Sequence, residues 1–230
     1  MSEVNAPELE FKVSDIPVFE SLPLFAPGIL EGKLPAKAYE LVLKNCLDSK
    51  VRENDGAQLN INSVKDVAVY PLENNEDKLF ENYMGRMFDE WVDTFDVPLP
   101  PIPLASGVTN AWVNYQKKGE FCPTHIHPDS IHFIVIVKVP YGDEEVDPSN
   151  YGKKFDGNMK NGSLEFIYNT PADGMSNHTI PLTSDDEGRV FLLPGRMMHQ
   201  IYPFSNADGE LITLCGNMSV FPVQQPQPEG

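Results

Sequence analysis

The stretch from Gly119 to Pro140, GEFCPTHIHPDSIHFIVIVKVP, constrains the fold of this chain more than any other segment. It places His125 and His127 two positions apart and continues as an apolar, β-branched run that is typical of a buried strand. Side chains two apart on a strand lie on the same face. A third imidazole, His199, follows far downstream in the segment PGRMMHQIYPF. Two neighbouring histidines and a distant third form the pattern by which a β-barrel builds a mononuclear metal site with open coordination positions.

The remainder of the chain supports a β-rich fold. From Val108 onward, short apolar or β-branched runs predict strands. They are TNAWVNYQK, EFCPTHI, SIHFIVIVKV, GSLEFIYN, GRVFLLP, HQIYPF and ELITLCGNM. Two long polar segments between them, residues 141–161 and 169–187, are expected to be loops that line an active or binding site. We therefore predict a double-stranded β-helix, a jelly-roll or cupin-like barrel.

The part of the chain before the barrel predicts helices. Pro35 to Leu47 has apolar residues at helical spacing, and Glu76 to Phe95 carries a stripe of Leu, Phe, Tyr, Met and Trp at i, i+3 and i+4. A proline-rich connector, residues 97–107, follows the second helix. The prediction is a mainly β protein with flanking helices, divided into three parts. Residues 1–107 form an N-terminal segment with two helices that pack on the barrel, residues 108–220 form the metal-binding core, and residues 221–230 form a disordered tail.

The composition limits the partners of the protein. Its 230 residues include 34 Asp and Glu against 17 Lys and Arg, which gives a net charge of −17. Such a charge repels phosphate backbones and anionic lipids, so we expect neither a nucleic-acid nor a membrane partner. The three cysteines share no motif spacing, and no signal-peptide pattern opens the chain. We therefore expect a protein of the reducing cytoplasm.

The order of the motifs resembles a known family. WVNYQKKGEF, HIHPDS, a β-branched strand ending in VP, GSLEF, GRVFLLPGRMMHQI and GELITLCGN follow one another over about residues 108–217. This order is similar to that of the iron(II)/2-oxoglutarate-dependent oxygenases, and the H-x-H-P segment is part of it. The resemblance implies that iron(II) is bound by His125, His127 and His199. The more familiar oxygenase triad is His-x-Asp with a distal histidine, and His127 with Asp129 fits that formula too, so Asp129 is an alternative ligand.

The sequence departs from the family pattern at the expected cosubstrate anchor. Oxygenases of this family carry G-x-R-x-S after the distal histidine, and their arginine binds the distal carboxylate of 2-oxoglutarate. Here the matching residues are Gly209, Leu211 and Thr213. Leucine cannot pair with a carboxylate, so either another cation, Lys138 or Arg196, takes the place of the arginine or 2-oxoglutarate is not the cosubstrate.

Two further positions complete the expected cosubstrate site. Asn114 resembles a residue that forms a hydrogen bond to the cosubstrate, and Thr213 matches a position of the anchoring strand. Trp112 on the same segment as Asn114 is expected to be a core residue, and His132 is expected to be structural or to lie at the rim of the site.

Three functions are consistent with these features. The first is a hydroxylase-type, non-haem Fe(II)/2-oxoglutarate-dependent dioxygenase. Its substrate would be a small molecule, a peptide or a protein. The second is a cupin-like metalloprotein with three histidines that does not use 2-oxoglutarate. The third is a non-catalytic barrel. A cation that reaches the metal cavity would favour the first function over the second.

Overall fold

The structure is a computed structural model that describes residues 20–22, 28–51, 64–72, 78–127, 131–141, 161–170 and 174–223. Within these ranges the chain forms two helices, α1 (Ala36–Val51) and α2 (Lys78–Thr94), one 3-10 turn, η4 (Ser184–Asp186), and eleven strands. The strands are β1 (Glu20–Leu22), β2 (Ile29–Lys33), β3 (Val67–Val69), β4 (Leu104–Lys117), β5 (Cys122–His125), β6 (Ile131–Lys138), β7 (Leu164–Thr170), β8 (Gly174–Ile180), β9 (Arg189–Pro194), β10 (Met198–Ile201) and β11 (Glu210–Pro222).

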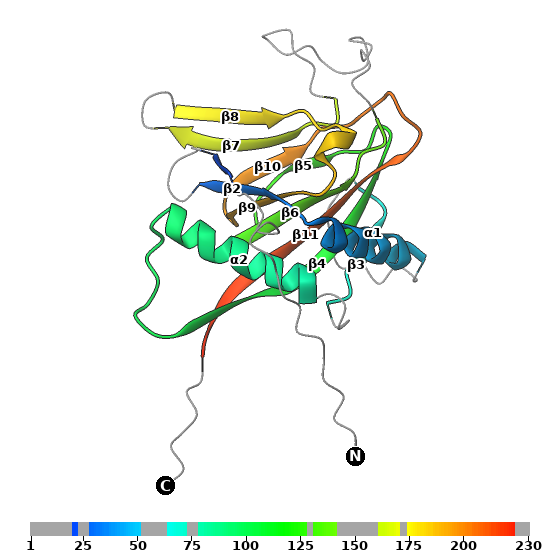
Figure 1. Cartoon of the computed structure of the whole chain (residues 1–230). Coiled ribbons are helices and arrows are strands. Elements are labelled where there is room, and N and C mark those ends of the chain that lie inside the picture. Colours follow the sequence, from blue (N-terminus) through cyan, green and yellow to red (C-terminus); the bar gives the residue numbers. More distant parts are fainter. Residues whose placement is uncertain are drawn as a thin grey trace, which may run out of the picture.

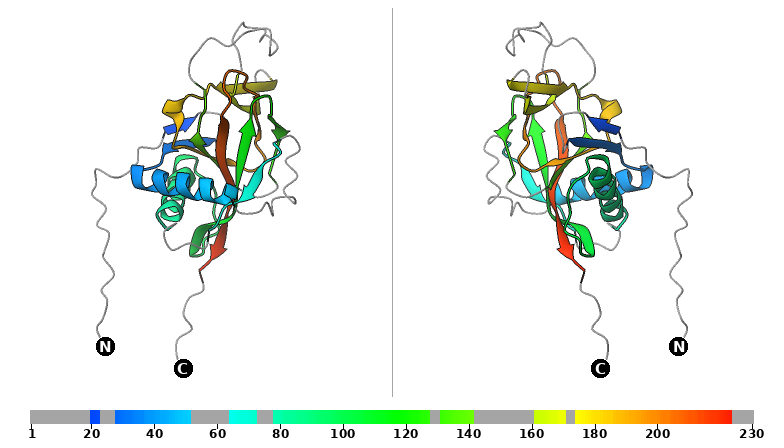
Figure 2. Two further views of the ribbon diagram at one scale, coloured as in Figure 1. Left: turned by 90° about the vertical axis from the view of Figure 1, so that its right-hand side faces the viewer. Right: turned by 90° about the vertical axis from the view of Figure 1, so that its left-hand side faces the viewer.

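The strands form two antiparallel sheets. The larger sheet has seven strands in the order β1-β2-β9-β6-β11-β4-β3, and the smaller has four in the order β5-β10-β7-β8. The two helices cover one face of the larger sheet, and the smaller sheet lies on its opposite side (Figures 1 and 2). The molecule is therefore mainly β with two flanking helices, which confirms this part of the predicted fold class.

Alternation along the central strands separates two hydrophobic clusters. On β6, Phe133 and Val135 pack with the helices, whereas Ile134 and Ile136 pack between the two sheets. Since neighbouring side chains of a strand point to opposite faces, a strand buried on both sides needs an almost continuous apolar run, and β6 has one. The layer between the sheets is the one in which the predicted metal site lies.

The helices form where their apolar spacing predicts them. The buried face of α2 consists of the stripe seen in the sequence: Phe80, Tyr83, Met84, Met87, Phe88 and Trp91. The Trp91 indole also donates a hydrogen bond of 2.8 Å to the carbonyl of Gly28, just before β2. The predicted helix at Pro35–Leu47 is present as α1, which runs about one turn further. Both predictions are confirmed.

One strand lies where a loop was predicted. Residues 169–187 include β8, which pairs along its whole length with β7. Its sequence, GMSNHTI, is polar because β8 is an edge strand with much of its surface exposed, so the apolar alternation that signals a strand is absent. Its main-chain hydrogen bonds to β7 determine its conformation. The prediction of a loop was wrong for this segment.

The predicted parts of the chain meet in one sheet. Strands β2 and β3, which precede residue 107, pair with β9 and β4. The predicted disordered tail, residues 221–230, begins inside β11, which ends at Pro222. Residues 224–230 of the tail, residues 1–19 and residues 142–160 of the first predicted binding loop lie outside the described residues.

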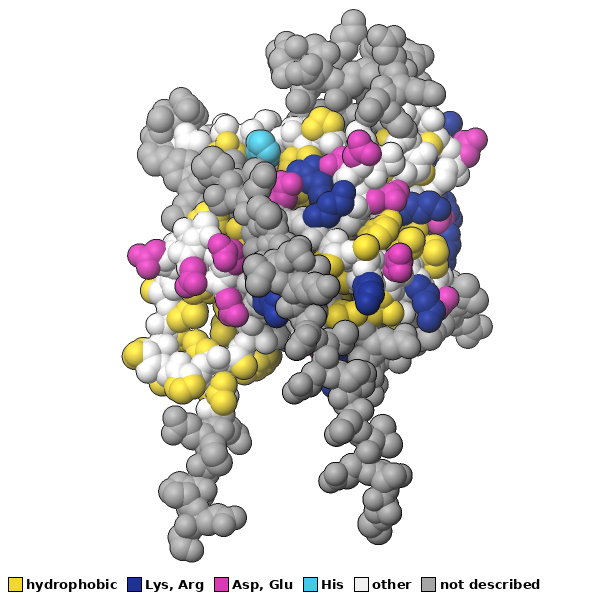
Figure 3. Space-filling model, in the orientation of Figure 1, with side chains coloured by type: hydrophobic (Ala, Val, Ile, Leu, Met, Phe, Trp, Pro, Cys, Tyr) yellow, Lys and Arg dark blue, Asp and Glu magenta, His cyan; other side chains and the backbone are white. Residues whose placement is uncertain are grey.

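The visible surface mixes charges of both signs with scattered hydrophobic side chains (Figure 3). Exposed large hydrophobic residues include Leu99 and Ile102, just before β4, and Phe221 and Val223, at the end of β11 and directly after it. Neither α1 nor α2 combines the length and the hydrophobicity that crossing a membrane requires.

Candidate metal centre

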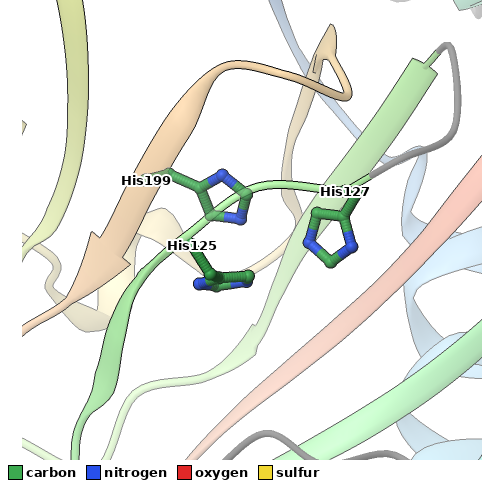
Figure 4. A group of neighbouring side chains, drawn as sticks. All are labelled: His125, His127 and His199. Carbon is green, nitrogen blue, oxygen red and sulfur yellow. The ribbon is translucent and has the colours of Figure 1, made fainter.

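Strand pairing in the smaller sheet brings the three predicted histidines together. Antiparallel pairing of β5 with β10 places His125 directly opposite His199. His127 lies two residues beyond His125, where its backbone N–H donates a 2.7 Å hydrogen bond to the carbonyl of Gly195. The three rings converge (Figure 4), and one ligand nitrogen from each lies within 4.8 Å of the other two. This grouping is compact enough to hold a single metal ion.

Backbone carbonyls determine which ring nitrogen two of these histidines offer. Nδ1 of His125 lies 2.7 Å from the carbonyl oxygen of Pro123, and Nδ1 of His199 lies 3.0 Å from that of Met197. A carbonyl oxygen only accepts, so each Nδ1 carries the proton and each Nε2 presents a lone pair. A hydrogen bond of this kind on the remote nitrogen is what orients a metal-binding imidazole.

Burial keeps the three imidazoles uncharged. Loss of hydration lowers the pKa of His127 to about 4 and that of His199 to about 3, and in both cases the neighbouring His125 adds to the decrease. Desolvation also lowers the pKa of His125, against an opposing hydrogen bond to Pro123. Neutral imidazole is the form that binds metals, so the site needs no deprotonation before it binds an ion near neutral pH.

Two thiols line the same layer without joining the group. Burial raises the pKa of both Cys122 and Cys215 to about 12. The sulfur of Cys122 lies 3.7 Å from Nδ1 of His125, on the side away from the free Nε2. A thiol binds a metal as thiolate, and a buried, protonated thiol does so poorly. Among the residues that the structure describes, the donor set is therefore nitrogen, which suits iron, zinc, copper and nickel.

A fourth imidazole, His132, belongs to this cluster. It is fully buried on β6, and its ring stacks on that of His127 with centroids 3.6 Å apart and an angle of 12° between the planes. Its centroid lies 5.2 Å from that of His199. Its Nδ1 is 3.0 Å from Oδ1 of Asn217, the residue paired with it across β6 and β11. We expected a structural or rim residue, and the structure places it in the interior of the site.

Trp112 borders the site as well as the core. The residue was expected to be a core residue and is 5% exposed, which agrees. Its ring also lies 5.4 Å from that of His127 and 5.7 Å from that of His132. Its indole N–H is buried and has no hydrogen-bond partner among the described residues. The indole is therefore a donor available to a molecule bound between the sheets.

The predicted cosubstrate residues Asn114 and Thr213 lie side by side. They are a cross-strand pair of β4 and β11, both buried, and Nδ2 of Asn114 donates to Oγ1 of Thr213 at 3.3 Å. The amide oxygen of Asn114 is buried without a partner in the described part of the chain. The pair therefore presents neutral polar groups to the layer between the sheets, on the same face of β4 as Trp112.

The expected cation is not part of this group. Leu211 is fully buried in the apolar cluster between the sheets, whereas Lys138 and Arg196 are both exposed. Among the described residues, no lysine or arginine is buried. The alternative ligand Asp129 lies outside the described residues.

The role of His132 could have been read from the sequence by one additional step. The run IHFIVIVK alternates between two apolar faces, and His132 shares a face with Ile134 and Ile136. A histidine on a strand buried on both sides, five positions after an H-x-H pair, points toward the same layer as that pair. Its stacking on His127 depends on where His127 lies beyond the end of β5, which no periodicity indicates.

The donor set fits a metal ion. Three neutral imidazoles converge. In His125 and His199, the hydrogen bond from Nδ1 to a backbone carbonyl leaves the lone pair of Nε2 available for a metal, and Nε2 of His127 is buried without a partner among the described residues. An unpaired buried nitrogen carries a desolvation cost that a bound ion would remove. The described residues supply three ligands, and a site with three protein ligands leaves coordination positions for other molecules.

Comparisons with known proteins found similarity among solved structures only. No protein-family model and no curated protein sequence matches the chain. Among solved structures, a prolyl-4-hydroxylase from Pseudomonas putida is similar with 14% identity and a TM-score of 0.52, over 82% of this chain and 90% of that chain. An oxidoreductase of the 2OG-Fe(II) oxygenase family from Burkholderia pseudomallei gives 12% identity and a TM-score of 0.47 over 82% and 84%. AviO1 from Streptomyces viridochromogenes gives 14% identity and 0.48 over 88% and 94%. At 14% identity the similarity to the hydroxylase shows a shared fold and nothing further.

Proposed function

We propose that this protein is a non-haem iron(II) dioxygenase of the 2-oxoglutarate-dependent type, with an unidentified small-molecule or protein or peptide substrate. The observation that carries the proposal is the convergence of three neutral imidazoles, of which His127 and His199 are buried and His125 is partly buried, with ligand nitrogens within 4.8 Å of one another. The fold that the chain shares with a prolyl-4-hydroxylase is compatible with it. In this proposal the two facing sheets are a double-stranded β-helix of the jelly-roll or cupin-like kind, residues 108–220 form its core, and the enzyme acts in the cytoplasm.

His125, His127 and His199 would hold the iron. The bound ion would activate dioxygen, with 2-oxoglutarate as the source of the remaining electrons. The chain itself orients the ligands through the carbonyls of Pro123 and Met197. Buried apolar side chains between the sheets, among them Ile134, Phe166 and Phe191, exclude bulk water from the reacting groups.

Neutral groups would position the cosubstrate near the metal. The indole N–H of Trp112 can donate a hydrogen bond, and the Asn114–Thr213 pair can both donate and accept. The distal carboxylate of 2-oxoglutarate needs a cation in addition. Lys138 and Arg196 remain the candidates named by the sequence, and either would have to turn inward from an exposed position to serve.

A second candidate function follows from the surroundings of Leu211. This side chain is fully buried in the apolar cluster between the sheets, which also contains Ile136, at the position where oxygenases of this type carry their arginine. A carboxylate buried there without a partner would be strongly unfavourable. This environment favours a cupin-like metalloprotein with three histidines that does not use 2-oxoglutarate.

One titration tests the proposal and separates the candidates. Iron(II)-loaded protein is titrated without oxygen with 2-oxoglutarate, and the weak charge-transfer band of the bidentate chelate is followed at about 500 nm. We expect the band in the wild type and its loss in His199→Ala. His178→Ala removes an imidazole on β8 outside the cluster and is the matched control. Iron binding without the band at millimolar cosubstrate would favour the second candidate, and no metal binding at all would leave a non-catalytic barrel.

A further inference from the structure

The ring of His127 is held differently from those of the other two histidines. His125 and His199 each have Nδ1 bonded to a backbone carbonyl. His127 lies beyond the end of β5, and within the described part of the chain its ring nitrogens make no hydrogen bond; only its backbone N–H is bonded, to Gly195. A ligand whose ring is free to rotate about χ2 loses orientation, so some other contact must fix the plane of this imidazole.

We propose that His132 is the positioning residue that fixes the ring plane of His127 in the metal centre, an inference that rests on the proposed metal site. The two rings stack face to face, 3.6 Å apart and 12° from parallel. Trp112 lies beside both, with centroids 5.4 Å from His127 and 5.7 Å from His132. Rotation of the His127 ring would drive its edge into the flat face of His132.

His132 can do this because it is itself fixed. It is fully buried in the centre of the larger sheet, and its Nδ1 bonds to Oδ1 of Asn217 at 3.0 Å. Asn217 is in turn the cross-strand partner of His132 on β11, and its carbonyl accepts a 3.1 Å hydrogen bond from the hydroxyl of Thr109. Two paired central strands thus hold the face on which His127 rests.

The stacking also distinguishes positioning from direct ligation. The lone pair of an imidazole nitrogen lies in the plane of its ring, so two parallel stacked rings direct their lone pairs side by side instead of at one point. A metal bound in the plane of His127 therefore lies outside the plane of His132. The flat face of His132, and not its nitrogen, is the part that acts on the metal site.

The test compares two replacements of similar size. His132→Phe keeps a flat ring against His127, whereas His132→Leu removes it; both lose the hydrogen bond to Asn217. Cobalt(II) is titrated into each metal-free protein, and its visible ligand-field spectrum reports affinity and coordination geometry. We expect His132→Leu to lose about 10- to 100-fold in cobalt affinity with an altered spectrum, and His132→Phe to stay within a few-fold of the wild type. Val135→Ala, on the opposite face of β6, is the control for lost core packing.

Separate outcomes would overturn the inference. If His132→Leu binds cobalt with wild-type affinity and spectrum, His132 does not position His127. If His132→Phe loses as much cobalt affinity as His132→Leu, and the NMR spectrum of the cobalt-loaded wild type shows four instead of three shifted exchangeable imidazole N–H resonances, then His132 is a ligand. If both variants fail to fold, Asn217→Ala serves as the test, because it removes the hydrogen bond to His132 and leaves the ring in place. We expect this variant to bind cobalt more weakly than the wild type, and an unchanged affinity would refute the positioning role of His132. If the wild type itself binds no cobalt, it is the proposed metal site that fails.

Discussion

Replacing His199 by asparagine should make the protein less sensitive to acid. In the folded chain, burial lowers the pKa of His199 to about 3, while the unfolded chain has an ordinary histidine with a pKa of 6.5. Below pH 6.5 the unfolded state therefore binds a proton at this position that the folded state does not. The contribution of neutral His199 to the unfolding free energy is therefore fully present above pH 6.5 and is lost as the pH falls toward the pKa of about 3 in the folded protein.

The size of the effect follows from the shift. Each pH unit within this window costs about 1.4 kcal/mol per histidine, so lowering the pH from about 8 to about 5 removes about 2 kcal/mol of unfolding free energy through His199 alone. Asparagine cannot bind the proton in either state. Its Nδ2 can also take over the hydrogen bond that Nδ1 donates to the carbonyl of Met197.

Urea unfolding in the presence of a chelator measures this effect. The unfolding free energy of His199→Asn is subtracted from that of the wild type at a series of pH values, so that the contributions of the many carboxylates cancel. We expect this difference to fall by about 2 kcal/mol between about pH 8 and about pH 5. His178→Asn, on the edge strand β8, controls for the loss of one imidazole. A difference that stays constant over this range would show that the folded protein does not hold His199 buried and neutral.

Three further predictions concern the same site and the sheet behind it. Because the pKa values of His127 and His199 lie at about 4 and 3, these two histidines should reduce the nickel(II) affinity measured by calorimetry by less than about twofold between about pH 8 and about pH 5, where each ordinary histidine would reduce it about 30-fold; a loss of about a hundredfold or more over that range would contradict the burial. Free metal at about 100 times its Kd should stabilise the wild type by about 2.7 kcal/mol in thermal melts, and His125→Ala should abolish that gain; an equal gain in the variant would place the metal elsewhere. Gly216→Ala should cost about 1–3 kcal/mol in urea unfolding, because the added methyl group would collide with both the backbone carbonyl of Asn110 and the ring of Phe133; a neutral result would mean that both the strand β4 and the ring give way without cost.

Local patterns predicted the elements of this fold well. The apolar stripe from Leu79 to Trp91 appears as α2, because a helix that buries one face repeats its apolar residues at the helical period. The β-branched run after the H-x-H pair appears as β6, because a strand buried on both faces needs an almost continuous apolar run. The strand β8 was missed because it has little apolar surface to bury, and its pairing with β7 carries no side-chain signature.

The candidate site was predictable as far as its residues lie in recognisable motifs, whereas the direction of other side chains was not. Spacing and motif order identified His125, His127 and His199, and the structure brings all three together. The same reasoning named Lys138 and Arg196 as possible cations, and both are exposed. Whether a charged side chain faces a cavity depends on bulges and turns, and β6 has an irregular register with β11 at Lys138.

What the sequence could establish was the kind of elements present and the set of imidazoles available, since both follow from side-chain chemistry at short range. Only the tertiary structure decided that His125 pairs with His199 across β5 and β10, and that His132 stacks on His127. The burial that lowers the histidine pKa values and keeps the ligands neutral could not be predicted from the sequence either. The reason is physical: register between distant strands and loss of hydration arise from the packing of the whole chain, and no short segment contains them.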